Sequence, residues 1–461
     1  MMMGIAVLVV VLLAGCAMDT NPGGLDPEPQ ETFNSATVSG NVQNSFDEDL
    51  AGVTITFYLN ALRKYQTTTD GDGDYSVTVY DKGSYKVRAS LGGYEEQDQT
   101  VSITSDGSYK TADFELEPES MEAGGIMASR AVSISGATIE FELDVFVVGS
   151  DGDFLDNLDA SSFVIEDANF TVNRANSATD PDNRRDSAGG KNDRQAQYPG
   201  NIAGVDSPQD TVYYDFTQIS VGGYTSPSYG SYSALLLFDQ SGSITSTDPD
   251  DSRIEAAKYF LNALGSGDNV MVAAFSKGGN LPYEPITYYG ESFTNDGLRY
   301  FSTLNGFKDT EGGNTPLFQA TYTMVDFTYS HAPNSNRAVV VFTDGEDTEG
   351  GRTIEEIVNL AQSLNVKVFT VGLSDNVNKK VLAEMAVGTG GALMWARDAR
   401  QLISTYKTLG NLLHGGAAYY GTRWRVQRSS GAFEGATGWF STHMKVELDN
   451  GTLYIPIYVE Y

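Results

Sequence analysis

Two carboxylates and three hydroxyls could hold a metal ion through their oxygens: four of these side chains follow two apolar runs, and the fifth lies in a loop between the runs. The runs cover residues 234–238 and 339–343. The first is followed by the pattern D-x-S-x-S, which is weak by itself because Asp and Ser also cap helices and stabilise turns. A loop threonine and a second aspartate further along the chain strengthen it, since three loops then offer hard oxygen ligands. The candidate ligands are Asp239, Ser241, Ser243, Thr315 and Asp344.

The elements that must position these ligands alternate between strands and helices. Strands are predicted at 270–275, 283–289 (an edge strand), 367–371 and 393–395. Two capping boxes, Ser252 with Glu255 and Thr353 with Glu356, predict helix starts. Such alternation indicates a doubly wound α/β sheet, in which ligands bind beyond the carboxyl ends of the strands where the strand order reverses.

Residues 231–413 resemble a von Willebrand factor type A domain that carries a metal-ion-dependent adhesion site. The D-x-S-x-S motif of that family matches Asp239, Ser241 and Ser243, its G-x-T-P-L threonine matches Thr315, and its T-D-G aspartate matches Asp344. The resemblance implies that all five bind one ion, and that the carboxylate of a partner completes its coordination. Because each ligand is a hard oxygen, Mg²⁺ is favoured, or Mn²⁺ in its place.

The N-terminal segment has the features of a bacterial lipoprotein signal. An apolar run at residues 5–13 leads into Leu13-Ala14-Gly15-Cys16, which resembles a lipobox, although residues 1–4 lack the usual Lys or Arg. The run is too short to cross a bilayer, so residues 1–16 are interpreted as a signal peptide with lipid attachment at Cys16. Ala17 and Met18 follow the cysteine, so no Asp stands in the position that favours retention in the inner membrane. We therefore expect a lipid-anchored protein of the bacterial cell envelope, at the outer membrane or cell surface.

Two further regions are predicted to be all-β. Residues 17–36 are rich in Pro, Gly and acidic residues and are interpreted as a flexible linker. Short alternating stretches then fill residues 37–119, where segments such as Gly83-Ser84-Tyr85-Lys86-Val87 resemble the carboxypeptidase regulatory-like, transthyretin-type β-sandwich. That family implies a spacer or recognition module without catalysis of its own.

The other β-rich region, residues 131–230, is interrupted at 172–210 by a polar stretch that we interpret as a disordered loop. The tail at 417–461 again has strand-like alternation around the hairpin signal Asp449-Asn450-Gly451. We expect this tail to complete the 131–230 region, so that the α/β domain is an insertion into a β-sandwich.

Composition narrows the function classes. A chain of 461 residues suits about three domains. A net charge of −32 argues against binding to nucleic acid, because the protein would repel its phosphates. Neither H-E-x-x-H nor G-x-S-x-G occurs, so an enzyme is not expected.

The predicted function is an interaction protein that binds a protein or extracellular-matrix ligand through a metal-bridged acidic residue. The alternative is an envelope scaffold whose β-domains make the contacts and whose metal is structural.

Overall fold

The computed structural model describes residues 33–171, 211–308, 310–375, 377–436 and 438–461. The predicted signal peptide with Cys16, most of the predicted linker and the predicted loop at 172–210 lie outside these residues. The described chain forms two compact units: the first runs to Ser90 and includes Glu96–Glu115, and the second comprises Leu91–Glu95 and Leu116–Tyr461. Across the described ranges, no helix has the length and apolar character needed to cross a membrane.

The first unit contains two sheets whose strands alternate between buried and exposed residues. In β4, for example, Tyr75, Val77 and Val79 are buried and the residues between them are exposed. This period of two is that of strands with one face toward a core and one toward solvent. One sheet contains β1 (Ala36–Asn44), β4 (Asp74–Val79), β7 (Tyr109–Thr111) and β8 (Phe114–Leu116). The other contains β2 (Thr54–Leu59), β3 (Leu62–Thr68), β5 (Gly83–Ser90) and β6 (Gln97–Ile103).

A parallel sheet lies at the centre of the second unit. Its strand order is β19-β18-β17-β14-β15, with β16 antiparallel at the edge, so the order reverses between the neighbours β14 and β17. All eight residues of β14 are buried, as expected for a strand covered by helices on both faces. The strands are β14 (Tyr232–Asp239), β15 (Asn269–Phe275), β16 (Ile286–Thr294), β17 (Asn336–Thr343), β18 (Val366–Leu373) and β19 (Leu393–Ala396).

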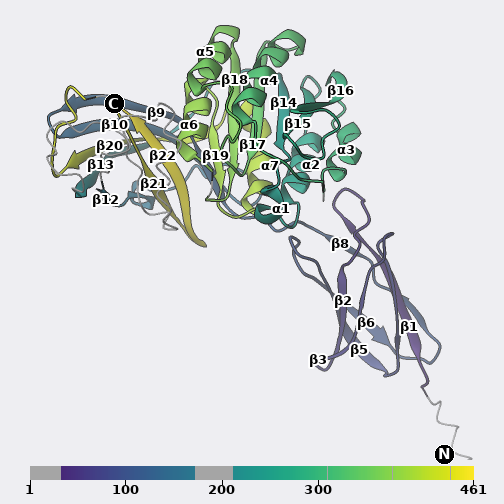
Figure 1. The fold of residues 1–461 in the computed structure, drawn as a ribbon. Helices are drawn as coiled ribbons and strands as arrows, with labels where there is room; N and C mark the ends of the chain where they lie inside the picture. The colour runs from purple at the N-terminus through teal and green to yellow at the C-terminus, as the bar shows by residue number, and fades with distance from the viewer. Residues whose placement is uncertain (1–32, 172–210, 309, 376, 437) are drawn as a thin grey trace, which may run out of the picture. The chain divides into compact units, whose positions relative to one another are not determined.

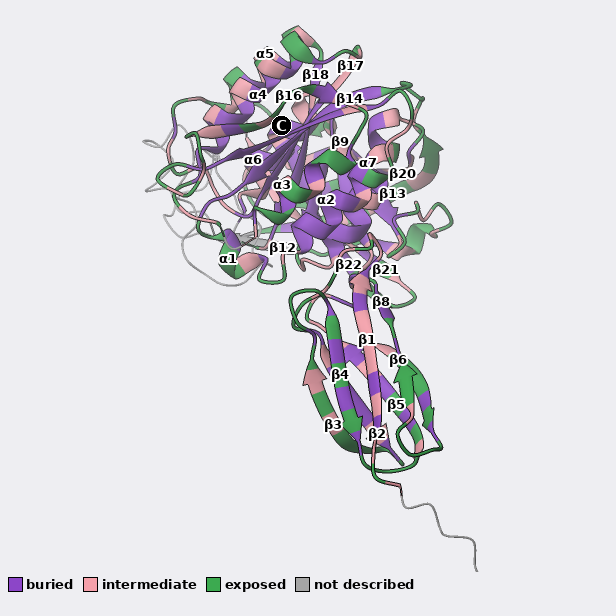
Figure 2. Ribbon diagram, turned by 90° about the vertical axis from the view of Figure 1, so that its right-hand side faces the viewer, coloured by how far each residue is buried: buried purple, intermediate pink, exposed green. Residues whose placement is uncertain are grey.

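Helices cover the two faces of this sheet, which is therefore buried between them (Figure 2). Apolar residues of α4, α5 and α6 belong to one core, and those of α2, α3 and α7 to another. The helices are α1 (Ile244–Thr247), α2 (Ser252–Asn262), α3 (Phe301–Asn305), α4 (Leu317–His331), α5 (Ile354–Leu364), α6 (Lys379–Gly388) and α7 (Gln401–His414).

Two local predictions need correction. The edge strand expected at 283–289 begins only at Ile286 and continues to Thr294. Ser252 does not cap α2: it is the first helical residue, and its N–H donates to the Asp248 carboxylate at 2.8 Å. A carboxylate four residues earlier thus replaces the capping box. The box predicted at Thr353 is present, with both reciprocal hydrogen bonds.

The sheet does not end at β19. It continues into strands from segments that precede and follow the α/β region in the sequence. β9 (Ala123–Ser135) pairs antiparallel with β19, and β10 (Thr138–Val148), β20 (Ala418–Arg428), β13 (Thr211–Thr225) and β12 (Ala168–Thr171) follow in that order. Figure 1 shows β9, β10, β20 and β13 extending away from the helices. Gly125 lies at the junction, where a Cβ would stand 2.2 Å from the Leu393 carbonyl oxygen. Glycine is therefore needed for the two strands to meet.

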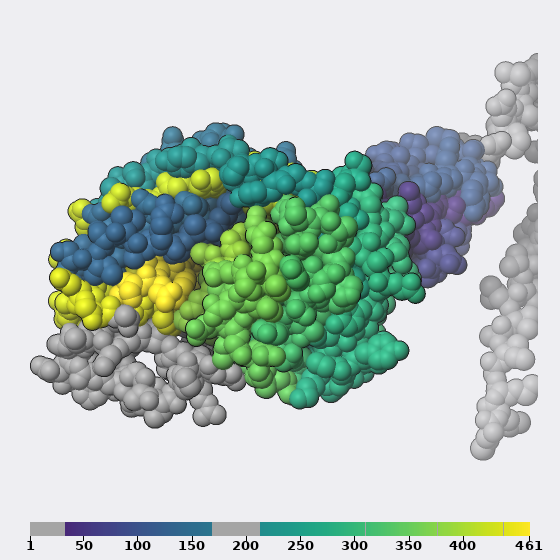
Figure 3. Space-filling view, turned by 90° about the horizontal axis from the view of Figure 1, so that it is seen from above, coloured from purple at the N-terminus to yellow at the C-terminus, as the bar shows by residue number. Residues whose placement is uncertain are grey.

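A second layer covers the extended part of the sheet. It consists of β11 (Phe163–Ile165), β21 (Trp439–Leu448) and β22 (Gly451–Glu460), and Phe141 of β10 packs edge-on against Phe440 of β21 at 5.6 Å between ring centroids. Asp449 and Asn450 form the turn between β21 and β22. Figure 3 shows the C-terminal segments, in yellow, lying against the green helical part of the same unit.

Candidate metal centre

Two carboxylates meet at adjacent strand ends. β14 and β17 pair in parallel with Phe238 opposite Phe342, so Asp239 and Thr343 end their strands side by side. The Thr343 hydroxyl donates to Asp239 Oδ2 at 2.6 Å, and Asp344 is the next residue along the chain. The acids are far apart in sequence, but parallel strands deliver their final residues to one edge of the sheet at the point where strand order reverses.

The loop after β14 turns its hydroxyls toward these acids. The Ser241 N–H donates to Asp239 Oδ1 at 2.9 Å, and the Ser243 hydroxyl donates to Asp344 Oδ1 at 2.8 Å. The two serine Oγ atoms are 3.2 Å apart. Ser241 is buried and Ser243 is exposed, so the cluster opens to solvent on the Ser243 side.

A third loop adds the threonine. The Gly242 N–H donates to the Gly313 carbonyl oxygen at 3.1 Å, which holds this loop against the first one. A Cβ on Gly345 would lie 3.7 Å from Thr315 Oγ1 and 3.8 Å from Ser243 Oγ, so both hydroxyls stand beside Gly345. Gly313 has a φ of +82°, and a side chain there would meet backbone at 2.5 Å. Only glycine suits that position.

Burial makes the paired carboxylates electrostatically unfavourable without a cation. The exposed fractions of Asp239 and Asp344 are 0% and 1%. Burial, together with the charge of Asp344, raises the pKa of Asp239 to about 7, and burial also raises the pKa of Asp344. Each side chain accepts hydrogen bonds, but these do not return either pKa to its ordinary value. A bound cation would compensate both charges.

The oxygen positions fit a small, hard cation. Adjacent ligands of an octahedral Mg²⁺ bound at about 2.1 Å lie about 3 Å apart. The distances from Ser243 Oγ to Ser241 Oγ and to Asp344 Oδ1 are 3.2 and 2.8 Å, close to that value. Within the described ranges, no group of three or more His, Cys, Asp or Glu side chains is arranged so that it could hold a metal ion. The present group is instead built from two carboxylates and three hydroxyls.

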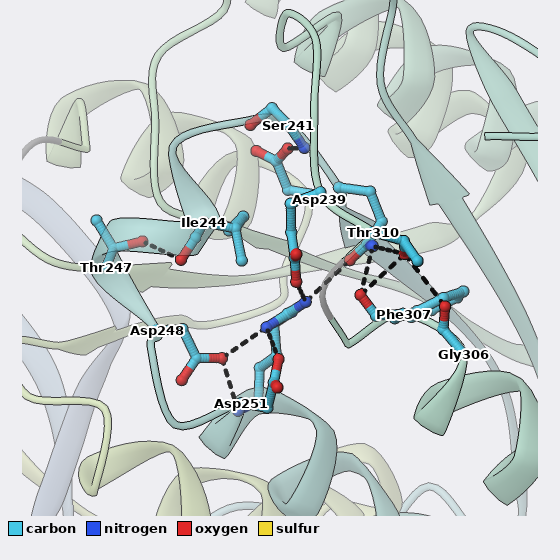
Figure 4. Close-up of polar contacts among 12 residues, drawn as sticks. Asp239, Ser241, Ile244, Thr247, Asp248, Asp251, Gly306, Phe307 and Thr310 are labelled. Atoms are coloured by element: carbon cyan, nitrogen blue, oxygen red, sulfur yellow. Dashed lines mark hydrogen bonds and ion pairs between the residues drawn. The ribbon is translucent and has the colours of Figure 1, made fainter. Parts of the chain in front are cut away.

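A buried arginine, not anticipated from the sequence, holds the surrounding loops. The Arg253 guanidinium is fully buried and donates to Asp248 at 3.0 Å, to Asp251 at 2.8 Å and also to Glu311. It also donates to the Gln240 amide oxygen at 3.2 Å. Figure 4 shows Asp248 and Asp251 on one side of this network. Arg253 thus ties the residue after Asp239 to the loop that carries Thr315.

The Gln240 amide extends the network to the other side. Its Nε2 donates to the Phe307 carbonyl oxygen at 3.1 Å and to Thr310 Oγ1 at 3.4 Å. Phe307 and Thr310 are labelled in Figure 4. The Gly312 N–H in turn donates to the Gln240 carbonyl oxygen at 2.9 Å. An arginine among three nearby acids at a helix start was the available sequence signal for this network. Nothing local in the sequence indicated which loops it would join.

The structure brings all five predicted ligands together, and their role in metal binding remains a prediction. It adds two hydroxyls that orient the acids, those of Thr343 on Asp239 and Thr247 on Asp344. The predicted lipidation residue, Cys16, lies outside the described residues.

Comparison with known proteins gives two family matches. The von Willebrand factor type A domain matches residues 235–407, and the carboxypeptidase regulatory-like domain matches residues 37–117. No curated protein matches the chain.

Several solved structures are similar in fold. A von Willebrand factor type A protein from Catenulispora acidiphila is 12% identical, with a TM-score of 0.35 over 57% of this chain and 74% of that one. The ArnB paralog VWA2 from Sulfolobus acidocaldarius is 14% identical, with a TM-score of 0.30 over 58% and 74%. Proximal thread matrix protein 1 from the mussel byssus, with a zinc-occupied MIDAS motif, is 16% identical, with a TM-score of 0.32 over 41% and 49%. The match thus spans about half of the mussel protein.

Proposed function

Because this chain contains a von Willebrand factor type A domain at residues 235–407, preceded by a carboxypeptidase regulatory-like domain at 37–117, we propose that it is a metal-dependent interaction protein. The two matches confirm both family resemblances and the multidomain α/β plus β-sandwich fold class. In our proposal, one divalent cation lies among the five oxygen-bearing side chains and holds an acidic residue of a protein or matrix partner. The convergence of three loops on two buried carboxylates is the observation that carries it.

We propose Mg²⁺, or Mn²⁺, as the ion. Asp239, Ser241, Ser243, Thr315 and Asp344 would hold it, because carboxylate and hydroxyl oxygens are hard ligands. When bound, the ion supplies a positive charge with an open coordination position on the solvent side. This charge matters because the chain carries −32 overall, which by itself opposes an acidic ligand. The positive charge of the ion would reverse the negative electrostatic field at the site, so that an acidic residue of a partner could bind there.

We also propose that the protein acts at the bacterial cell envelope through a lipid on Cys16, and that it has no catalytic activity. The lipobox-like segment supports the first point. Replacement of Cys16 by serine should release the protein from the membrane fraction, while a Met18→Ala control should leave it there. If the Cys16→Ser and Met18→Ala proteins were found in the same cell fraction, lipid anchoring would be contradicted.

The central test has two stages. Isothermal titration calorimetry with Mg²⁺ and Mn²⁺ should show one site in the chain from residue 17 onward. Asp239→Ala should abolish that site, while Asp296→Ala, an exposed acid, should not. Unchanged metal binding in Asp239→Ala would refute the site.

The second stage tests the partner. Envelope and matrix fractions are passed over the immobilised chain in Mg²⁺ and in EDTA. A partner retained only in Mg²⁺, and only by protein with Asp239, supports metal-bridged binding. A partner that is retained equally in EDTA and by the Asp239→Ala protein would instead support the scaffold function, in which the β-domains make the contacts.

A further inference from the structure

A cavity of about 470 Å³ lies beside the candidate metal centre. Residues of the T-D-G loop, the starts of α4 and α5, helix α6 and the first residue of β21 form its walls. It therefore uses both the α/β part and the C-terminal β-layer of the second unit. Its main lining residues are Leu317, Phe318, Glu346, Ile354, Val381 and Trp439.

The cavity adjoins the metal centre directly. Gly345 lines it, and the same glycine stands beside the hydroxyls of Thr315 and Ser243. Leu317, two residues after Thr315, lines it as well. A partner whose carboxylate reached the metal would therefore have its neighbouring side chains at the entrance of this cavity.

Much of the wall is apolar, with one aromatic ring available to a ligand. Trp439 is partly exposed, whereas Phe318 is largely buried beneath the surface. The Lys380 ammonium lies 5.1 Å from the Trp439 ring centroid, so this ring already attracts a cation. An aliphatic stem could pack on these walls with its charged end close to the indole.

The charged residues of the wall leave an excess of negative charge. Lys380 is paired with Glu384 at 2.7 Å, so these two charges largely cancel. The Asp347 carboxylate caps α4 by accepting from the Phe318 N–H at 3.0 Å. Glu346 and Glu355 also line the cavity, and neither forms an ion pair with a side chain in the part of the chain that the structure describes.

We propose that this cavity binds a basic side chain, arginine in particular, next to the acidic residue that the metal holds. The partner would then be a protein segment in which an Asp or Glu lies within about two residues of an Arg. A planar guanidinium suits both features, since it stacks on indole and pairs with carboxylates. The inference rests on the proposed function for its acidic half, whereas the basic half depends only on the cavity.

Tryptophan fluorescence can report on the cavity. The chain has three tryptophans, and both Trp395 and Trp424 are 2% exposed. Quenching by acrylamide should therefore come mainly from Trp439. A ligand that fills the cavity should protect this fluorescence.

The test uses blocked hexapeptides with a single Asp, in which one of the two positions on either side holds Arg, norleucine or Glu. Binding is measured by calorimetry and by protection of Trp439, in Mg²⁺ and in EDTA. In Mg²⁺ the best Arg peptide should bind about tenfold more tightly than its norleucine counterpart, a typical gain for one well-placed charged contact. The double variant Glu346→Gln/Glu355→Gln should remove this preference. Glu291→Gln, an exposed acid on the edge strand β16, is the matched control and should keep it.

The outcomes separate this inference from the proposed function. Equal affinity for Arg and norleucine peptides, with binding still dependent on Mg²⁺, would overturn the cavity assignment and leave the metal site intact. N-acetylarginine amide that protects Trp439 even in EDTA, and loses this effect in the double variant, would support the cavity without the metal. Trp439→Phe keeps an aromatic wall, so loss of the Arg preference in Glu346→Gln/Glu355→Gln but not in Trp439→Phe would assign the selectivity to charge.

Discussion

Replacement of Arg253 by methionine is expected to loosen the loops around the candidate metal centre and to destabilise the second unit. Methionine can fill most of the space of the arginine stem but cannot pair with the three acids. Two of those acids, Asp248 and Glu311, have side chains that are 0% and 5% exposed, so solvent cannot replace the lost cation.

The expected loss follows from the geometry. Opposite charges 3.0 Å apart, as for Arg253 and Asp248, attract by about 5.5 kcal/mol at an effective dielectric constant of 20. Asp248 would still accept from the Ser252 N–H at 2.8 Å and from the backbone N–H of residue 253 at 3.1 Å. We therefore expect a loss of about 3 kcal/mol in the free energy of unfolding, the lower end of the range for a broken buried pair. Mg²⁺ affinity should fall about tenfold, because groups that orient ligand loops typically contribute that much.

Urea unfolding in EDTA measures the stability, and calorimetry with Mg²⁺ measures the affinity. Arg130→Met is the matched control: Arg130 is 57% exposed and its ion pair with Glu142 should contribute less than about 1 kcal/mol. A double-mutant cycle with Glu311→Gln should show coupling, because the two side chains share one ion pair. If Arg253→Met and Arg130→Met cost the same, the buried network does not support the loops and the reasoning is wrong.

Three further predictions use the same unfolding assay. Addition of EDTA to protein in Mg²⁺ at a hundredfold excess over its Kd should lower the free energy of unfolding by about 2.7 kcal/mol, and an absent shift would contradict a native-state metal site. Burial lowers the pKa of His443 to about 3, so the contribution of this group to stability, taken as the difference between the wild type and His443→Leu, should be constant above pH 6.5 and fall by about 1.4 kcal/mol per pH unit between pH 6.5 and about 3. His443→Leu should flatten this slope, and His331→Gln, on an exposed site, should not. Gly125→Ala should cost at least about 2 kcal/mol because its Cβ would meet the Leu393 carbonyl, whereas Gly223→Ala, with open space around it, should be tolerated.

Much of the α/β fold could be predicted because its signals are local. Uninterrupted apolar runs such as 234–238 are typical of parallel strands covered on both faces, and the structure buries every residue of β14. The capping box at Thr353 forms as predicted, since both of its partners lie within one helical turn. By contrast, α2 begins without the capping box predicted at Ser252, because the Asp248 carboxylate of the preceding turn accepts from the backbone N–H groups of Ser252 and Arg253.

The five candidate ligands could also be chosen from the sequence. Their residue types and their places after strands or before a helix are sufficient once the strand order is known to reverse between β14 and β17. The orienting groups could not be chosen in this way. Thr343 contacts Asp239 only because the two strands pair in register, and Arg253 meets Glu311 only because two loops pack together.

By itself, then, the sequence determined the alternation of strands and helices, the set of candidate oxygen ligands and the net negative charge of the chain. Each of these depends on residue type and short-range spacing. Only the tertiary structure decided that β19 continues into β9, that a buried arginine joins the ligand loops and that Trp439 closes a cavity beside Gly345. These features depend on which distant segments pack against each other, and the free energy of that packing is spread over many contacts of the whole second unit.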